Sequence, residues 1–97
     1  MEKRTNKYKL TLEILSTAKE DDTNYLPIEL EFDNHDNIFT IIEKMKKRNI
    51  FHTENQAIEF AIGLKMFSEV MLKNRDNALF SEFKSAFGEL MKKLKSS

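Results

Sequence analysis

The chain has 97 residues, of which 40% are hydrophobic and 33% are charged, and its 16 basic side chains balance 16 acidic ones. This length and composition are typical of one globular domain, and they exclude a disordered chain or a two-domain protein. The chain contains no cysteine, which excludes a disulfide framework, a thiol nucleophile and a cysteine-ligated metal site.

The net charge of zero conceals blocks of opposite sign. The blocks sum to +3 over residues 1–9, −7 over 10–37, +3 over 38–48, −2 over 49–72 and +3 over 73–97. This alternation argues against a uniformly basic nucleic-acid-binding protein, but it allows a local basic patch or head-to-tail association of unlike blocks. No apolar signal core follows the charged N-terminus, and the longest apolar segment contains charged residues. We therefore expect a soluble, cytoplasmic protein without a membrane span.

Two strands are predicted near the N-terminus. Apolar and polar residues alternate over residues 8–15 and again over residues 28–32, which is typical of strands with one buried face. Because a polar stretch separates the two strands, they most simply pair as an antiparallel hairpin. In that hairpin Lys9 would face Glu29 or Glu31.

The first helix is predicted to follow the second strand. Asn34 or Asp36 is placed to cap it, and its basic last turn would complement the negative end of the helix dipole. The residues expected on its buried side are Ile38, Ile41, Ile42, Met45 and Ile50.

The second helix has the clearest start signal in the chain. Thr53 and Gln56 form a capping box, and the helix is expected to run to about Asn74. It is apolar on two sides. One stripe contains Ala57, Phe60, Ala61, Leu64, Phe67 and Met71, and a roughly opposite stripe contains Ile58, Ile62, Met66 and Val70. A helix with two apolar faces must be sandwiched, either inside its own fold or against another chain, so Ile58, Ile62 and Met66 are a candidate interface.

A third helix is predicted from about Ala78 to Leu94, after a capped turn at residues 74–77. Its apolar residues are spaced by three and four, which favours an antiparallel helical hairpin with the second helix. The stripe contains Leu79, Phe80, Phe83, Ala86, Phe87, Leu90, Met91 and Leu94.

The predicted fold is therefore α+β. An N-terminal antiparallel β-hairpin is expected to pack on three helices in the order ββααα, with the second helix central. Residues 1–97 are expected to form a single domain, with a flexible basic arm at residues 1–7 and a flexible tail at residues 95–97.

Residues 33–36, with the sequence Asp-Asn-His-Asp, form the densest group of potential metal ligands or acid–base residues. Asn and Asp are expected there as helix caps, and no further histidine or cysteine cluster lies nearby in sequence. The only glycines are Gly63 and Gly88, so a phosphate-binding glycine loop and a G-x-S-x-G nucleophile motif are both excluded. We expect no catalytic residue, cofactor or metal site.

Seven basic side chains cluster near the predicted ends of the first and third helices. They would form a phosphate-binding patch if those two helix ends converge, although dipole compensation already explains their positions. The candidate patch consists of Lys44, Lys46, Lys47, Arg48, Lys92, Lys93 and Lys95.

Four runs, in this order, carry a resemblance to a known family: KRTNKYKLTLE, FDNHDNIFTIIEKMKKRN, GLKMFSEVMLKNR and FGELMKKLK. The chain resembles, over essentially its whole length, a small bacterial family of uncharacterised proteins, domain of unknown function 3861. The resemblance implies a stand-alone bacterial cytoplasmic protein with a hairpin-plus-helices fold. It implies no activity, ligand or catalytic residue.

The functional hypothesis from the sequence is a non-enzymatic protein-interaction module that self-associates, because the second helix has a surplus apolar face. The partner would be a second copy or another protein, not a membrane. The alternative hypothesis is a nucleic-acid-binding accessory protein that uses the lysine and arginine clusters at the helix ends.

Overall fold

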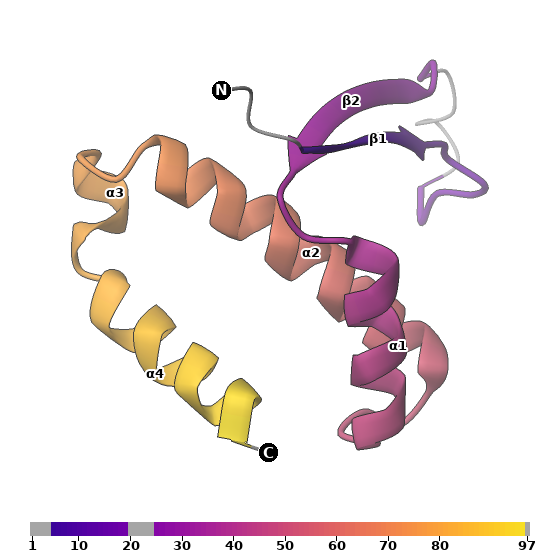
Figure 1. Cartoon of the computed structure of the whole chain (residues 1–97). Helices are drawn as coiled ribbons and strands as arrows, with labels where there is room; N and C mark the ends of the chain where they lie inside the picture. The colour runs from indigo at the N-terminus through magenta and orange to yellow at the C-terminus, as the bar shows by residue number, and fades with distance from the viewer. Residues whose placement is uncertain (1–4, 20–24, 97) are drawn as a thin grey trace. The chain divides into compact units, whose positions relative to one another are not determined.

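We analysed a computed structural model of the chain, which describes residues 5–19 and 25–96. The chain divides into two compact units, residues 1–36 and residues 37–97, and each unit is described by itself. Figure 1 labels the elements, whose bounds are β1 Asn6–Leu12, β2 Ile28–Asn34, α1 Ile38–Arg48, α2 Glu54–Lys73, α3 Ala78–Ser81 and α4 Lys84–Ser96. A two-stranded antiparallel sheet followed by helices confirms the predicted α+β class.

The hairpin unit pairs β1 with β2 in antiparallel register, with Asn6 opposite Asn34 and Leu12 opposite Ile28. The backbone of Lys9 faces Glu31, while its ammonium group lies 3.4 Å from the carboxylate of Glu29. Both acidic residues expected near Lys9 therefore lie beside it. The strand β1 is displaced from the predicted range 8–15 towards the N-terminus, so two residues assigned to a basic arm belong to the sheet.

The apolar side chains of the hairpin share one face, as their alternation predicts. The rings of Tyr8 and Phe32 stack with centroids 5.4 Å apart, and Leu10 lies opposite Leu30. Burial falls along this face, because Tyr8, Phe32 and Leu10 are half-buried whereas Leu12 is 65% exposed. The face is therefore only partly covered.

Side-chain hydrogen bonds close the end of the hairpin that leads towards α1. The buried Asn34 accepts a hydrogen bond at its Oδ1 from the backbone N–H of Asp36, at 2.9 Å. Asn6 donates from its Nδ2 to the carbonyl of Asn34 at 3.3 Å, and the Tyr8 hydroxyl donates to the carbonyl of Asp36 at 3.0 Å. These bonds satisfy backbone groups where the ladder ends and fix the turn after β2.

The cap of α1 is Asn37, so the predicted caps Asn34 and Asp36 were wrong. The Oδ1 of Asn37 accepts from the backbone N–H groups of Phe39 and Thr40, at 3.0 and 3.3 Å. Asn34 is instead occupied in the preceding turn, where its side chain bonds to Asp36. All three polar side chains suit a helix start, and the geometry of the turn decides which one caps the helix.

The helix α1 ends at Asn49, which adopts the left-handed conformation with φ of 57°. Asparagine tolerates this conformation better than most residues, and its N–H closes the helix by donating to the carbonyl of Lys46 at 3.3 Å. Ile50 comes after this turn and is 48% exposed, so its predicted burial was wrong. The helical period no longer applies to a residue beyond the helix end.

The core of the helical unit lies where α1 packs on α2. The buried residues are Ile38, Ile42, Met45, Ala57, Ala61 and Met71. The two alanines lie four residues apart, hence on one face of α2, and their small side chains allow the branched residues of α1 to approach closely. The buried side of α1 matches the prediction, with Ile41 only half-buried.

The start of α2 differs from a full capping box in one hydrogen bond. The Thr53 hydroxyl accepts from the N–H of Gln56 at 3.1 Å, as predicted. The side-chain oxygen of Gln56 accepts from the N–H of His52 at 3.2 Å, one residue before the cap. The rings of Phe51 and Phe60 pack 5.0 Å apart and further hold the chain entering α2. The helix ends at Lys73, as the sequence predicts.

The predicted third helix is divided into α3 and α4. Asn77 caps α3 by accepting from the N–H of Leu79 at 2.9 Å, which confirms the expected capped turn. The N–H of Phe83 donates to the carbonyl of Phe80, three residues back, so the chain tightens before α4 begins. The Ser81 hydroxyl also donates to the carbonyl of Ala78 at 3.0 Å, as the Ser68 hydroxyl does to the carbonyl of Lys65 within α2.

An aromatic cluster joins α2 to the segment that follows it. The ring of Phe67 lies 6.0 Å from Phe80, 5.8 Å from Phe83 and 6.0 Å from Phe87, measured between centroids. Through these edge-on contacts, the apolar stripe of α2 packs against the apolar stripe of the following segment, as the sequence predicts. Among the described side chains of α4, however, none is buried.

Replacement of Ala61 by leucine tests whether the close approach of α1 and α2 is the main packing contact. Ala61 has no exposed surface, so Ala61→Leu should overpack the contact and lower the free energy of unfolding by about 1–3 kcal/mol. Chemical denaturation followed by circular dichroism measures this change. An unchanged midpoint would show that the contact is loose enough to accept three more carbon atoms.

Replacement of Gly63 by alanine is the matched change on the same helix. A Cβ atom at Gly63 meets no atom within 4 Å, so the substitution adds helix propensity without a clash. Gly63→Ala should raise the free energy of unfolding by about 0.5–1 kcal/mol in the same denaturation experiment. A loss of stability would contradict the open surroundings of this residue.

Candidate functional site

The three residues of the candidate interface, Ile58, Ile62 and Met66, all lie on α2 and are all half-buried. They are neither part of the buried core nor fully exposed. On the same helix Val70, from the same predicted stripe, is 53% exposed. The exposed part of that stripe therefore lies towards the C-terminal end of α2.

The segment after α2 exposes more apolar surface than its periodicity suggests. Leu79 on α3 is 77% exposed, and Phe83 and Leu90 are also exposed. Phe87 and Leu94 belong to the same stripe of α4 and are half-buried. We call Phe83, Phe87, Leu90 and Leu94 the α4 stripe.

A second exposed apolar surface lies on the hairpin unit, at the end distant from Asn34. Its members are Leu12, Ile14, Leu15, Tyr25, Leu26 and Ile28, all of which are exposed. We call this set the hairpin apolar end. Sequence reasoning missed it as a surface, because alternation indicates which side chains share a face but not whether anything covers them. One sequence signal was available, since residues 16–24 contain one alanine and no larger apolar side chain.

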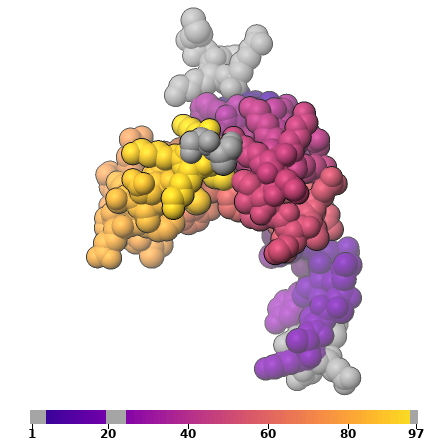
Figure 2. Space-filling view, turned by 90° about the horizontal axis from the view of Figure 1, so that it is seen from below, coloured from indigo at the N-terminus to yellow at the C-terminus, as the bar shows by residue number. Residues whose placement is uncertain are grey.

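The two basic groups of the candidate phosphate patch lie at the same end of the helical unit. In Figure 1 the C-terminal ends of α1 and α4 both lie low in the view, and Figure 2 shows the chain from that side. Within the patch, Lys46 pairs with Glu43 at 3.3 Å and Lys92 pairs with Glu89 at 3.9 Å. Lys44, Lys47, Lys93 and Lys95 have exposed side chains, and Arg48 is half-buried.

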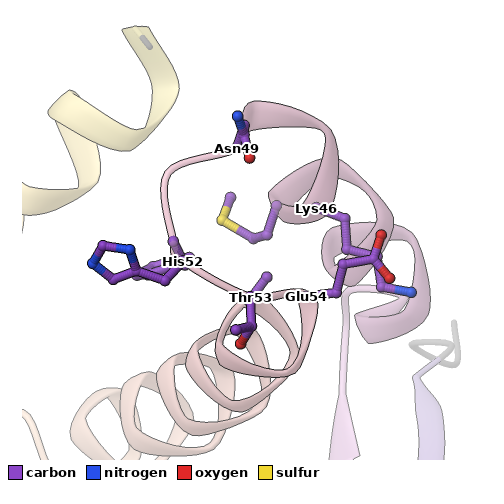
Figure 3. Close-up of a pocket in the computed structure, with 8 residues that line it drawn as sticks. Lys46, Asn49, His52, Thr53 and Glu54 are labelled. Atoms are coloured by element: carbon purple, nitrogen blue, oxygen red, sulfur yellow. The ribbon is translucent and has the colours of Figure 1, made fainter.

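A small pocket lies between the end of α1 and the start of α2, with a volume of about 100 Å³. Figure 3 shows Asn49 and Thr53 beside it, with the imidazole of His52 turned outward. The volume is well below the ~300–1,000 Å³ of typical small-molecule sites. Thr53 is already engaged as the cap of α2. The arrangement is that of a helix–helix junction.

Residues 33–36 form the last two residues of β2 and the bend that follows it. Asn34 and the backbone of His35 and Asp36 are held by the hydrogen bonds of Asn6 and Tyr8. In residues 5–19 and 25–96, no three His, Cys, Asp or Glu side chains are grouped so that they could hold a metal ion. The two histidines, His35 and His52, belong to different units.

In the part of the chain that the structure describes, no helix is both long enough and apolar enough to cross a membrane.

Comparison with known proteins agrees with the fold and assigns no activity. A crystal structure of a protein of unknown function from Pectobacterium atrosepticum is 32% identical to this chain. The similarity covers 97% of this chain and 100% of the other, with a TM-score of 0.83. No curated protein matches the chain. Residues 6–96 match the family DUF3861, described as a domain of unknown function with a solved structure. The chain therefore belongs to the DUF3861 family, which confirms the resemblance carried by its four sequence runs.

Proposed function

We propose that this protein is a non-enzymatic interaction module that associates with a second copy of itself in the cytoplasm. One observation carries the proposal. Of the described residues, no large side chain is fully buried, while 15 large hydrophobic side chains are exposed. Exposed apolar side chains that form a contiguous patch mark protein–protein contact sites.

The state of α4 supports the same proposal. This helix has 13 residues, a length at which an isolated helix is marginal in water. Such a helix is stabilised by packing its apolar face, yet in the chain the rings around Phe67 meet only its first turn. A partner that covers the rest of the α4 stripe would supply the missing packing.

The half-buried Ile58, Ile62 and Met66 belong to the same proposal. They extend the apolar surface of α2 beyond the core formed with α1. Burial of half-exposed aliphatic side chains between subunits would contribute roughly 1 kcal/mol for each side chain.

Ile62→Asp tests whether this face lies between subunits. If it does, a charged group there should leave a folded chain with the helical content of the wild type but shift the protein from dimer to monomer. Light scattering coupled to size exclusion measures the mass, and circular dichroism measures the fold.

Ile62→Val is the control, since it keeps the apolar character and should keep the dimer. An unfolded Ile62→Asp protein would show that the face is internal and would remove it from the interface. A wild-type protein that stays monomeric up to high micromolar concentration would overturn self-association itself.

A second candidate function is nucleic-acid binding. The observation that favours it is that the C-terminal ends of α1 and α4, which carry the two basic groups, lie on the same side of the helical unit (Figure 1). The pairs that Lys46 and Lys92 already form with glutamates lessen the charge available. For that reason we place this candidate second.

The double variant Lys46→Gln/Lys47→Gln tests nucleic-acid binding. Loss of two phosphate contacts should weaken binding and lower the slope of log K against log salt by about 2. Fluorescence anisotropy with labelled DNA and RNA measures both quantities. Lys73→Gln/Arg75→Gln, at the other end of α2, is the matched control and should leave binding unchanged. No binding at any salt concentration would exclude this candidate.

A further inference from the structure

We propose that the hairpin unit of one copy docks through its apolar end onto the α4 stripe of a second copy, in a reciprocal exchange. This arrangement rests on the proposed self-association and specifies the two surfaces that meet. It follows from the apolar exposure of each surface and from the opposite charges of the two units.

The hairpin apolar end is the first surface. Leu12 and Ile28 face each other across the last pair of the ladder and are 65% and 61% exposed. Between Leu15 and Tyr25 the sequence contains no large apolar side chain. A two-stranded sheet is marginal without a layer over its apolar face, so the covering layer must come from elsewhere.

The α4 stripe is the second surface. Phe87, Leu90 and Leu94 are spaced by three and four along one side of α4, and Phe83 lies directly before the helix. The aromatic contacts with Phe67 hold its N-terminal part, at Phe83 and Phe87. Leu90, one turn further, is exposed and Leu94 is half-buried. The part of the stripe beyond Phe87 is therefore the part that a sheet face of a second copy would cover.

The charges of the two units argue for unlike pairing. Residues 1–36 carry nine acidic and five basic side chains, a net charge of −4, while residues 37–97 carry seven and eleven, a net charge of +4. Restricted to the described residues 5–19 and 25–36, the hairpin unit still has five carboxylates against three lysines. The helix α4 has four lysines and one glutamate. The acidic hairpin and the basic helix are therefore electrostatically complementary.

The same charges argue that the occupant is a second copy. Pairing of hairpin with hairpin, or of α4 with α4, would bring like charges together, which is unfavourable. Two copies that each place the hairpin on the other's α4 match both surfaces at once and form a closed, two-fold assembly. Since the chain is neutral overall, no long-range repulsion opposes the encounter of two copies.

A complementation experiment tests the exchange. One variant, Leu12→Thr/Ile28→Thr, removes the hairpin surface but keeps residues that favour strands, and the other, Leu90→Gln/Leu94→Gln, removes the α4 stripe but keeps helix formers. The dimer dissociation constant of each variant alone, measured by analytical ultracentrifugation, should rise by about tenfold or more. An equimolar mixture should regain heterodimer, because the intact hairpin of one chain still meets the intact α4 of the other.

The outcomes separate this arrangement from self-association in general. Two results would contradict the exchange but not self-association. One is that both variants dimerise with the affinity of the wild type, and the other is that the mixture dimerises no more tightly than either variant alone. A monomeric wild type would overturn both.

A charge variant keeps the test valid if the apolar variants lose their fold. Glu29→Gln/Glu31→Gln changes the exposed polar face of β2 and removes the exposed ion pair of Glu29 with Lys9, which contributes little to stability, so the hairpin should remain intact. The variant should dimerise more weakly than the wild type. Its dissociation constant should also change less between 50 and 500 mM NaCl, because two charges that salt would screen are gone. Unchanged affinity and an unchanged salt dependence would contradict the charge pairing.

Discussion

The close approach of α1 to α2 is the contact on which the helical unit depends. Ala57 and Ala61 are the most buried residues of α2, and they lie on one face where a larger side chain would force the helices apart. Ile42 and Met45 of α1 fill the same core from the other side. This core is small, because two of its six buried members are alanines. The other apolar residues of α2 and α4 are half-buried or exposed.

Much of the local structure could be predicted because short-range chemistry determines it. The Thr53 cap, the Asn77 cap and the alternation in the hairpin each depend on neighbours within four residues or on one strand partner. The cap of α1 could not be predicted from the same rule. Residues 33–37 offer several polar side chains that suit a helix start, and the selection depends on the turn that Asn34 forms with Asp36. The break after Ser81 lies within a continuous apolar periodicity, so the spacing of apolar residues does not reveal it.

The candidate surfaces could be predicted only in part, since a hydrophobic pattern identifies a shared face but not its cover. It placed Ile58 and Ile62 on a surplus face, and both are half-buried. It predicted one buried face along the whole hairpin, yet Leu12 and Ile28 are among the most exposed apolar residues. The difference arises because burial is decided by distant segments or by other chains, and the spacing within one strand carries no information about them.

The zero net charge of the chain adds an argument for the specific partner that we propose. A protein with exposed apolar side chains and a net charge near zero lacks the repulsion that keeps identical molecules apart, so non-specific association is favoured. Separation of the charge into an acidic hairpin unit and a basic helical unit changes this balance, because it penalises like-on-like contacts and favours one relative orientation. Apolar burial then supplies the affinity while charge supplies the selectivity. In this proposal, exposed apolar side chains and separated charges therefore act together in a chain whose own core is small.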